Sequence, residues 1–198
     1  MIVGVLGLQG DIREHTNALE ACDADVRVVR RKDEIKSIDA LVIPGGESTT
    51  IAHLAKIFDV FELIQSRIKD GLPVYGSCAG MILLANQVLD AAADQQTFGG
   101  LDIVVRRNAF GRQVDSFEAD VEISGMTQSM RAVFIRAPWV ESTGEKVSVL
   151  ASVTSPSGES HAVAVRQGPL LATSFHPELT NDNRIHRYFL DEVCGRSK

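Results

Sequence analysis

Short segments of uninterrupted apolar residues, alternating with helical patterns, constrain the fold of this chain more than any other feature. Residues 1–7, 40–43 and 73–75 are such segments. A strand that is apolar at every position is buried on both faces, which is typical of a parallel sheet covered by helices. The first half of the chain therefore predicts a doubly wound arrangement, with strands at 1–7, 26–30, 40–43 and 73–75 and helices at 12–22, 49–56, 58–69 and 79–86.

The second half has a different pattern, in which strand-like segments follow one another directly. Turn-forming pairs such as Ser124-Gly125 and Gly168-Pro169 separate them. The pattern predicts antiparallel additions to the sheet, at 103–106, 117–123, 132–136, 147–153, 161–166 and 170–174, and a last helix at 182–193. We therefore expect an α/β fold in a single domain, residues 1–198: a three-layer α/β/α sandwich with a mixed, mainly parallel central sheet.

Composition excludes several classes of function. The formal net charge of −6 argues against a nucleic-acid-binding protein, because phosphate binding needs a basic surface. No apolar run approaches the roughly 20 residues of a membrane span, and the chain enters a strand-like pattern without a signal-peptide layout. Three cysteines cannot all pair within one chain. Together these features favour the reducing cytoplasm, where a cysteine is free to act as a nucleophile.

The motif Gly76-Ser77-Cys78-Ala79-Gly80 joins the predicted strand at 73–75 to an apolar helix. A glycine-flanked strand-to-helix turn is the nucleophile-elbow arrangement, here with cysteine in place of serine. The helix N-terminus favours the thiolate, and the Ala79 N–H points to where an oxyanion would form. Cys22 and Cys194 lack this setting, so we expect them only to pack.

Of the five histidines, His176 is the best candidate for the base. It follows the apolar segment 170–174, at the end of a strand where α/β sheets place their ligands. Glu178 is two residues further on, and in an extended segment both side chains would project to the same side. A carboxylate there would orient the imidazole. His15, His53 and His186 lie in helical patterns, and His161 opens a strand without a suitable carboxylate, so we expect surface or packing roles for them.

A second glycine-rich segment, Pro44-Gly45-Gly46-Glu47-Ser48, follows the predicted strand at 40–43. It lacks the lysine and the glycine spacing of a phosphate loop. Two interpretations remain and are compatible with each other: the Gly46 N–H completes an oxyanion hole, or the turn caps the helix that follows.

These motifs together resemble the class I, triad-type glutamine amidotransferases. More narrowly, the chain is similar to the family of glutaminase subunits of pyridoxal 5′-phosphate synthase. The segments that carry this likeness span nearly the whole chain: 4–10 (GVLGLQG), 13–15 (REH), 44–50 (PGGESTT), 107–113 (RNAFGRQ), 116–117 (SF), 134–138 (FIRAP) and 174–180 (SFHPELT). Residues 91–97 match nothing that we can assign and are interpreted as a variable surface loop.

The resemblance implies a flavodoxin-like glutaminase fold, no cofactor and no metal. It implies that Cys78 attacks L-glutamine, that His176 transfers protons and that Glu178 orients His176. The glutamine site would be lined by Gly46, Glu47, Ser48, Arg107, Ile135 and Arg136, with an oxyanion hole from Gly46 and Ala79. Of the adjacent Arg106 and Arg107, which an extended segment points oppositely, Arg107 is chosen because it directly precedes residues 108–113. Gln9 would face the synthase subunit, with which the chain would form a hetero-oligomer.

Two other classes of function stay open on the residues alone. A free-standing hydrolase, such as a γ-glutamyl hydrolase or a cysteine-peptidase-like protein, would share the cysteine and histidine but should lack segments 107–113 and 134–138. A non-enzymatic regulatory subunit would be expected to lack a triad member. Ammonia release from glutamine, measured with and without the synthase subunit, would separate these possibilities.

Overall fold

The computed structural model describes residues 1–107, 109, 116–154 and 158–196. Most of the segment 107–113, namely residues 108 and 110–113, therefore lies outside the described residues. The strands are β1 (Ile2–Leu6), β2 (Asp25–Val29), β3 (Ala40–Ile43), β4 (Val74–Ser77), β5 (Ala85–Leu89), β6 (Leu101–Arg106), β7 (Ser116–Val121), β8 (Met130–Ile135), β9 (Trp139–Thr143), β10 (Ser148–Thr154), β11 (Ser160–Gln167) and β12 (Leu170–Thr173).

The helices are α1 (Ile12–Glu20), α2 (Lys32–Lys36), α3 (Ser48–Ile57), α4 (Phe61–Lys69), α5 (Ala79–Leu84) and α6 (Arg184–Tyr188). A 3-10 turn, η1 (Pro177–Leu179), follows β12, and α6 continues as a π-helix, η2 (Phe189–Val193). Within the described ranges, no helix combines the length and the apolar character needed to cross a membrane.

The main sheet has the strand order β2-β1-β3-β4-β12-β11-β9-β6-β5, with β10 paired to β11. The strands from β2 to β12 in this order are parallel, as the uninterrupted apolar segments predict. Beyond β12 the pairing becomes antiparallel through β11, β9 and β6. The expected mixed, mainly parallel α/β sheet is thereby confirmed.

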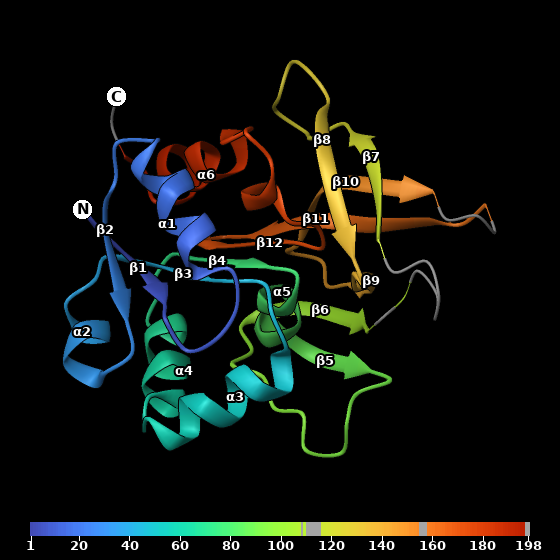
Figure 1. Cartoon of the computed structure of the whole chain (residues 1–198). Helices are drawn as coiled ribbons and strands as arrows, with labels where there is room; N and C mark the ends of the chain where they lie inside the picture. The colour runs from blue at the N-terminus through green and yellow to red at the C-terminus, as the bar shows by residue number, and fades with distance from the viewer. Residues whose placement is uncertain (108, 110–115, 155–157, 197–198) are drawn as a thin grey trace.

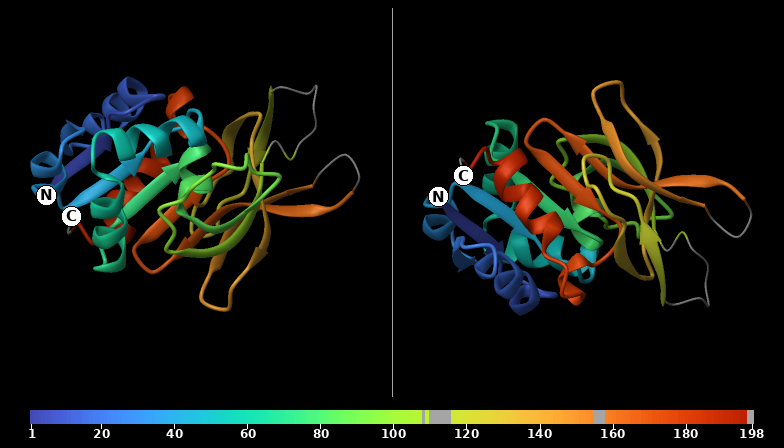
Figure 2. Two further views of the ribbon diagram at one scale, coloured as in Figure 1. Left: turned by 90° about the horizontal axis from the view of Figure 1, so that it is seen from below. Right: turned by 90° about the horizontal axis from the view of Figure 1, so that it is seen from above.

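Helices cover both faces of the parallel half of the sheet (Figure 1). On one face α1, α6 and η2 pack through Leu19, Ile185 and Phe189 against side chains that include Leu171. On the other face α2, α3, α4 and α5 pack through a second apolar cluster that includes Ile64. The antiparallel strands extend to one side of these three layers, as Figure 2 shows from above and below.

Three details differ from the sequence-based expectation. The helix predicted for 79–86 ends at Leu84, and Ala85 turns to extended geometry and opens β5. Strand β9 and helix α2 were not anticipated. Among the described residues, strands β7 and β8 form a separate two-stranded sheet and so are not additions to the main sheet.

Candidate active site

A cavity of about 430 Å³ opens at the carboxyl ends of the parallel strands. This is the edge where open α/β sheets bind their ligands, because the loops leaving adjacent strands converge there. Residues at or after the ends of β1, β3, β4, β6, β8 and β12 line the cavity: Gln9, Asp11, Gly46, Glu47, Ser48, Cys78, Ile82, Arg107, Ile135, Arg136, His176 and Leu179. Most of the predicted site residues are thus brought together at one place.

Cys78 lies between β4 and α5 with φ 49° and ψ −99°, a backbone conformation that is strained for any residue with a side chain. Close packing imposes it. A Cβ on Gly76 would lie 2.5 Å from the Gly80 backbone, and a Cβ on Gly80 would lie 2.4 Å from the Ile43 carbonyl oxygen. The elbow motif predicts an exposed nucleophile, but Cys78 is only 7 % exposed and lines the cavity.

Glu178 lies directly behind His176. The His176 Nδ1 is 2.7 Å from Glu178 Oε1, and the Glu178 side chain is fully buried. The two residues do not belong to an extended segment, as the sequence suggested, because Pro177 opens the 3-10 turn η1 and the turn brings the side chains together. Ser77, from the elbow motif, donates its hydroxyl to the same carboxylate at 3.1 Å.

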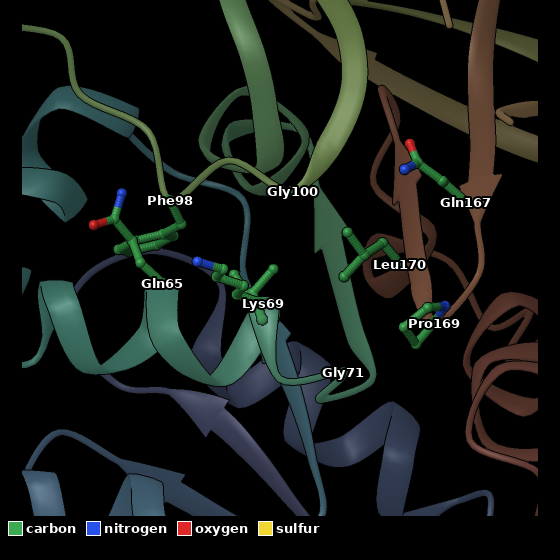
Figure 3. Close-up of a pocket in the computed structure, with 9 residues that line it drawn as sticks. Gln65, Lys69, Gly71, Phe98, Gly100, Gln167, Pro169 and Leu170 are labelled. Atoms are coloured by element: carbon green, nitrogen blue, oxygen red, sulfur yellow. The ribbon is translucent and has the colours of Figure 1, made fainter. Parts of the chain in front are cut away.

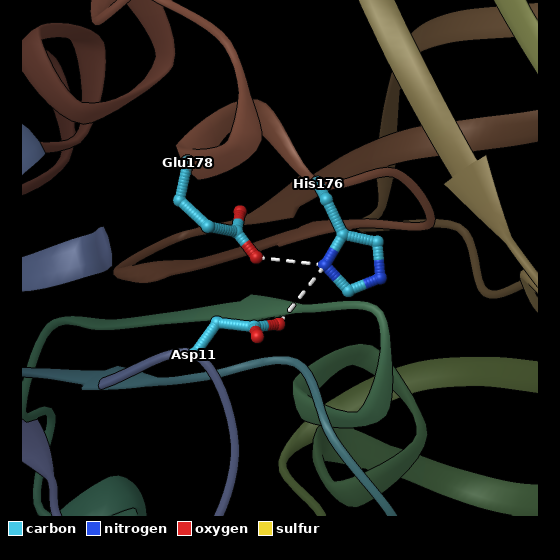
Figure 4. A group of neighbouring side chains, drawn as sticks. All are labelled: Asp11, His176 and Glu178. Carbon is cyan, nitrogen blue, oxygen red and sulfur yellow. Dashed lines mark hydrogen bonds and ion pairs between the residues drawn. The ribbon is translucent and has the colours of Figure 1, made fainter. Parts of the chain in front are cut away.

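Asp11 is a second carboxylate beside the same imidazole, with its Oδ2 3.4 Å from His176 Nδ1 (Figure 4). Burial lowers the pKa of His176, but hydrogen bonds with Asp11, Cys78 and Glu178 outweigh it and raise the pKa above its ordinary value. Burial raises the pKa of Glu178, but His15 and His176 hold it well below its usual range. The site therefore favours an ionised Glu178 and an imidazolium at His176, within hydrogen-bonding reach of the Cys78 thiol.

The donor atoms of Asp11, His176 and Glu178 lie within 4.8 Å of one another, a spacing that also suits a metal ion. In this arrangement the His176 Nδ1 is already hydrogen-bonded to Glu178. The cluster therefore fits a histidine oriented by carboxylates, which leaves Nε2 for chemistry.

The Gly45-Gly46 turn has a defined peptide orientation. The Gly45 carbonyl accepts a hydrogen bond from the Asp11 N–H at 3.1 Å, so the N–H of the same trans peptide, that of Gly46, faces the opposite way. Gln9 Oε1 accepts the Glu47 N–H at 2.8 Å and holds the next peptide. Ala79 is the first residue of α5, and the helix itself has no acceptor for its N–H.

The side chain of Glu47 is engaged within the protein. Its Oε2 accepts the Thr50 N–H at 2.7 Å and so caps α3, while its Oε1 pairs with Arg107 at 2.9 Å. The interpretation of residues 44–48 as a helix-capping turn is thus correct. Arg107 is thereby fixed at the wall of the cavity with a carboxylate partner.

Gln95 joins this group from the segment that the sequence left unassigned. Its Oε1 accepts hydrogen bonds from Ser48 Oγ at 2.7 Å, from Thr49 Oγ1 at 3.2 Å and from Arg107 Nη1 at 3.2 Å. The segment 91–97 therefore contacts the site from behind, and is more than a surface loop.

The two adjacent arginines point in opposite directions, as expected for an extended segment. Arg106 pairs with Asp90 and Glu141, away from the cavity, whereas Arg107 lines it. Arg136 lies at the rim with φ 42°, a second strained backbone position at this site, next to the half-exposed Ile135.

A larger cavity, of about 540 Å³, lies at the opposite end of the sheet, where β4 and β12 begin (Figure 3). Two of its polar side chains are already used: Gln65 donates to the Thr97 carbonyl, and Gln167 accepts the Asp102 N–H. Its lining residues include no cysteine, histidine or carboxylate. We therefore assign the chemistry to the smaller cavity.

Among the predicted site residues, Ala79 and Glu178 do not line the cavity but lie immediately behind it. Sequence reasoning missed Asp11, Ser77, Gln95 and His15 as neighbours of the site. Ser77 had a signal, since it belongs to the elbow motif. The others come from segments whose approach to the site depends on the tertiary fold.

Comparison with known proteins agrees with this geometry. Residues 5–195 match the model of the SNO glutamine amidotransferase family. The pyridoxal 5′-phosphate synthase subunit PdxT of Kineococcus radiotolerans is 60% identical over 98% of this chain and 95% of its own length. The subunit of the same name from Rhodococcus jostii is 57% identical over 98% of both chains.

A solved structure described as a glutamine amidotransferase superposes with a TM-score of 0.89 at 46% identity, covering 99% of this chain and all of its own. Sequence motifs, site geometry and full-length similarity lead to one assignment. This chain belongs to the SNO glutamine amidotransferase family.

Proposed function

We propose that this chain is the glutaminase subunit of a pyridoxal 5′-phosphate synthase. It hydrolyses L-glutamine to L-glutamate and ammonia, and passes the ammonia to the synthase subunit with which it assembles as a hetero-oligomer. The observation that carries the chemistry is the strained Cys78 in one cavity with His176, with Glu178 hydrogen-bonded behind the imidazole. The whole chain acts as one domain, in the cytoplasm, where reducing conditions keep the Cys78 thiol free.

In the first half of the reaction, the Cys78 thiolate attacks the side-chain amide carbon of glutamine. A C–S bond forms, and the amide oxygen takes the electron pair while the Gly46 and Ala79 N–H groups stabilise it. The C–N bond then breaks, and the nitrogen takes a proton from His176 and leaves as ammonia. The raised pKa of His176 suits this step, because it keeps a proton available for the leaving group.

In the second half, the neutral His176 removes a proton from water, which attacks the thioester carbon. The C–S bond breaks, the sulfur returns to the Cys78 thiolate, and glutamate leaves. Glu178 holds the imidazole tautomer through both halves and stabilises the imidazolium.

The substrate site is formed by Gly46, Glu47 and Ser48 at the start of α3 and by Arg107, Ile135 and Arg136 across the cavity. A guanidinium group binds a carboxylate with two parallel hydrogen bonds, so Arg136 and Arg107 offer partners for the α-carboxylate of glutamine. Glu47 acts indirectly, through its ion pair with Arg107.

Ammonia release from glutamine, measured together with the synthase subunit, tests this assignment. Cys78→Ser should abolish release and keep the fold, since a serine hydroxyl ionises far less readily than a thiol. His176→Asn should be about as damaging, because triad members act as a unit. Glu178→Gln should be milder, because it keeps a hydrogen-bonding group and loses only the charge.

Two results would contradict the assigned roles. Glutamine hydrolysis that survives in Cys78→Ser would place the nucleophile elsewhere. A Glu178→Gln variant less active than His176→Asn would exchange the roles of the orienting residue and the base.

A further inference from the structure

Two buried histidines lie behind Glu178, and the proposed mechanism does not use either. His15 on α1 and His186 on α6 are both 0% exposed. Their rings pack edge-on against the buried Tyr75, with centroid distances of 5.9 and 5.8 Å. Burying a histidine costs free energy unless its ring nitrogens have polar partners. The neighbours of each nitrogen therefore indicate which nitrogens carry protons.

The nitrogens form a chain that ends at the triad carboxylate. His186 Nε2 is 3.0 Å from His15 Nδ1, and His15 Nε2 is 3.4 Å from Glu178 Oε1. Only one proton can lie between the two rings. Burial, and then the neighbouring His15, lower the pKa of His186 to about 3, so His186 is neutral and carries a single N–H.

The negative charge of Glu178 determines which ring nitrogen of His15 carries a proton. A bare His15 Nε2 lone pair facing an ionised oxygen would be repelled, so Nε2 carries a proton that points at Glu178. This holds whether His15 is neutral or charged. If His15 is neutral, its Nδ1 is bare and accepts the N–H of His186 Nε2. His186 Nδ1 is then the bare nitrogen, and among the described residues it has no hydrogen-bond partner.

Glu178 Oε1 thus has three polar neighbours: His176 Nδ1 at 2.7 Å and Ser77 Oγ at 3.1 Å, which are hydrogen-bonded to it, and His15 Nε2 at 3.4 Å, which lies just outside hydrogen-bond geometry. The last distance is long for an N–H···O bond, so its contribution is chiefly electrostatic. A carboxylate with no solvent contact needs such donors to stay ionised and fixed.

We propose that His15 is a positioning residue of the triad, which holds the Glu178 carboxylate ionised and aligned on His176 through a buried chain that starts at His186. The proposal rests on the proposed function, since it assumes that Glu178 orients the catalytic histidine. His15 does not touch the substrate and acts only through Glu178.

NMR of the full chain with isotope-labelled histidine nitrogens tests the proton arrangement without any glutaminase assay. We expect His15 to be protonated at Nε2 and, while His15 is neutral, His186 to be the Nε2–H tautomer. In His15→Leu the signal of the His176 Nδ1 proton should shift or broaden, because its acceptor is less firmly held. A bare His15 Nε2, or an unchanged His176 signal in that variant, would overturn the proposal.

Kinetics with the synthase subunit give an independent readout. His15→Leu should lower kcat for glutamine about tenfold, because it removes a polar group that stabilises the buried charge of Glu178, with KM unchanged. His15→Gln should restore part of the rate, since its amide N–H reaches about as far as Nε2. A control is His161→Leu, at a partly buried ring on β11 that stacks on Trp139, which should leave kcat unchanged.

Failure of this proposal and failure of the proposed function are distinguishable. An unaltered chain that releases no ammonia would contradict the glutaminase assignment, while the NMR result would still decide the role of His15. Equal loss of kcat in His15→Leu, His15→Gln and His161→Leu would indicate a packing role and overturn the proposal.

Discussion

Cys78 differs from the other two cysteines in the properties that decide thiol reactivity. It lines the cavity at a strained turn and has His176 within reach. Cys22 is fully buried, and burial raises its pKa. Burial also raises the pKa of Cys194 to about 12. The thiolate is the nucleophile, so a group with a raised pKa reacts slowly at neutral pH.

A diazoketone analogue of glutamine should therefore alkylate Cys78 in preference to Cys22 and Cys194. At pH 8 only about one part in 10⁴ of a thiol with the pKa of Cys194 is ionised. Mass spectrometry of the labelled peptides measures the selectivity, with Cys78→Ser as the control that should stay unlabelled. Equal labelling of all three cysteines would argue strongly against Cys78 as the nucleophile.

His186 should make the fold sensitive to acid. Its pKa is lowered to about 3, whereas the unfolded chain takes up the same proton near about 6.5. The unfolded state thus binds more protons below about 6.5, so stability is intact above that pH. It falls as the pH decreases towards 3, by at most about 1.4 kcal/mol per pH unit.

Urea denaturation at about pH 7, 6 and 5 would measure this contribution. His186→Gln should flatten the decrease in unfolding free energy across this range, whatever its effect at pH 7. His53→Gln, at an exposed position on α3, is the control and should keep the original slope. The interpretation is wrong if His186→Gln and the unaltered chain lose stability in parallel.

At the scale of elements, the steric fit of α5 against β3 fixes the elbow. Alanine is normally favoured over glycine within a helix by up to about 1 kcal/mol. At Gly80, however, a Cβ would lie 2.4 Å from the Ile43 carbonyl oxygen, which belongs to a central strand and cannot easily move. Overpacking of this kind typically costs about 1–3 kcal/mol and should outweigh the gain in helix propensity.

Gly80→Ala should therefore lower the free energy of unfolding by about 1–2 kcal/mol in urea denaturation. Its glutaminase activity should fall as well, because Cys78 is placed by the same turn. Greater stability in this variant would show that α5 can move away from β3 without strain.

The segment 91–97 has its own test, in two neighbouring glutamines. Gln95 accepts hydrogen bonds from Ser48, Thr49 and Arg107, whereas Gln96 is exposed. Gln95→Ala should raise KM for glutamine about fivefold and leave kcat within about twofold, since it loosens the wall of the substrate site. Gln96→Ala should change neither constant. Equal effects of the two changes would mean that the segment acts only as a whole.

An element could be predicted from the sequence when its pattern is contained in its own segment. The parallel strands and the elbow were predictable because each carries its own signal, an apolar run or flanking glycines. Strand β5 was missed because Ala85 continues an apolar run that also suits a helix, and the change of direction at Ala85 has no local marker. The separate β7–β8 sheet depends on packing that no single segment encodes.

At the scale of the whole molecule, the site is assembled from contacts that are distant in sequence. The Cys78, His176 and Glu178 set was predictable because elbow and His-Pro-Glu are both motifs. Asp11 and His15 come from α1 and its start, and no sequence pattern places them beside His176 and Glu178. Strand order alone, with β12 between β4 and β11, brings these parts together.

The same assembly links the Gly45-Gly46 turn to the surface. Gln9 is the residue expected to face the synthase subunit, and its side-chain oxygen accepts a hydrogen bond from the Glu47 N–H. The backbone N–H of Asp11 donates a hydrogen bond to the Gly45 carbonyl. Ile135 and Leu179, 38% and 43% exposed, flank the same cavity. A partner that docks on this rim would press directly on the groups that hold the Gly45-Gly46 turn.

Partner binding should therefore raise glutaminase activity. Free ammonia made without an acceptor wastes glutamine, and a di-glycine turn can adopt more than one peptide orientation. Loss of one oxyanion-hole donor costs on the order of 10²–10³ in rate, so a shift between two orientations is enough to switch the site.

We expect low activity from the isolated chain and a marked rise as the synthase subunit is titrated at saturating glutamine. A variant such as Gln9→Ala should bind glutamine but respond less to the partner, because it releases the Glu47 N–H. If the isolated chain is already fast and the titration is flat, control by the partner is excluded, while the roles of Cys78, His176 and Glu178 are unaffected.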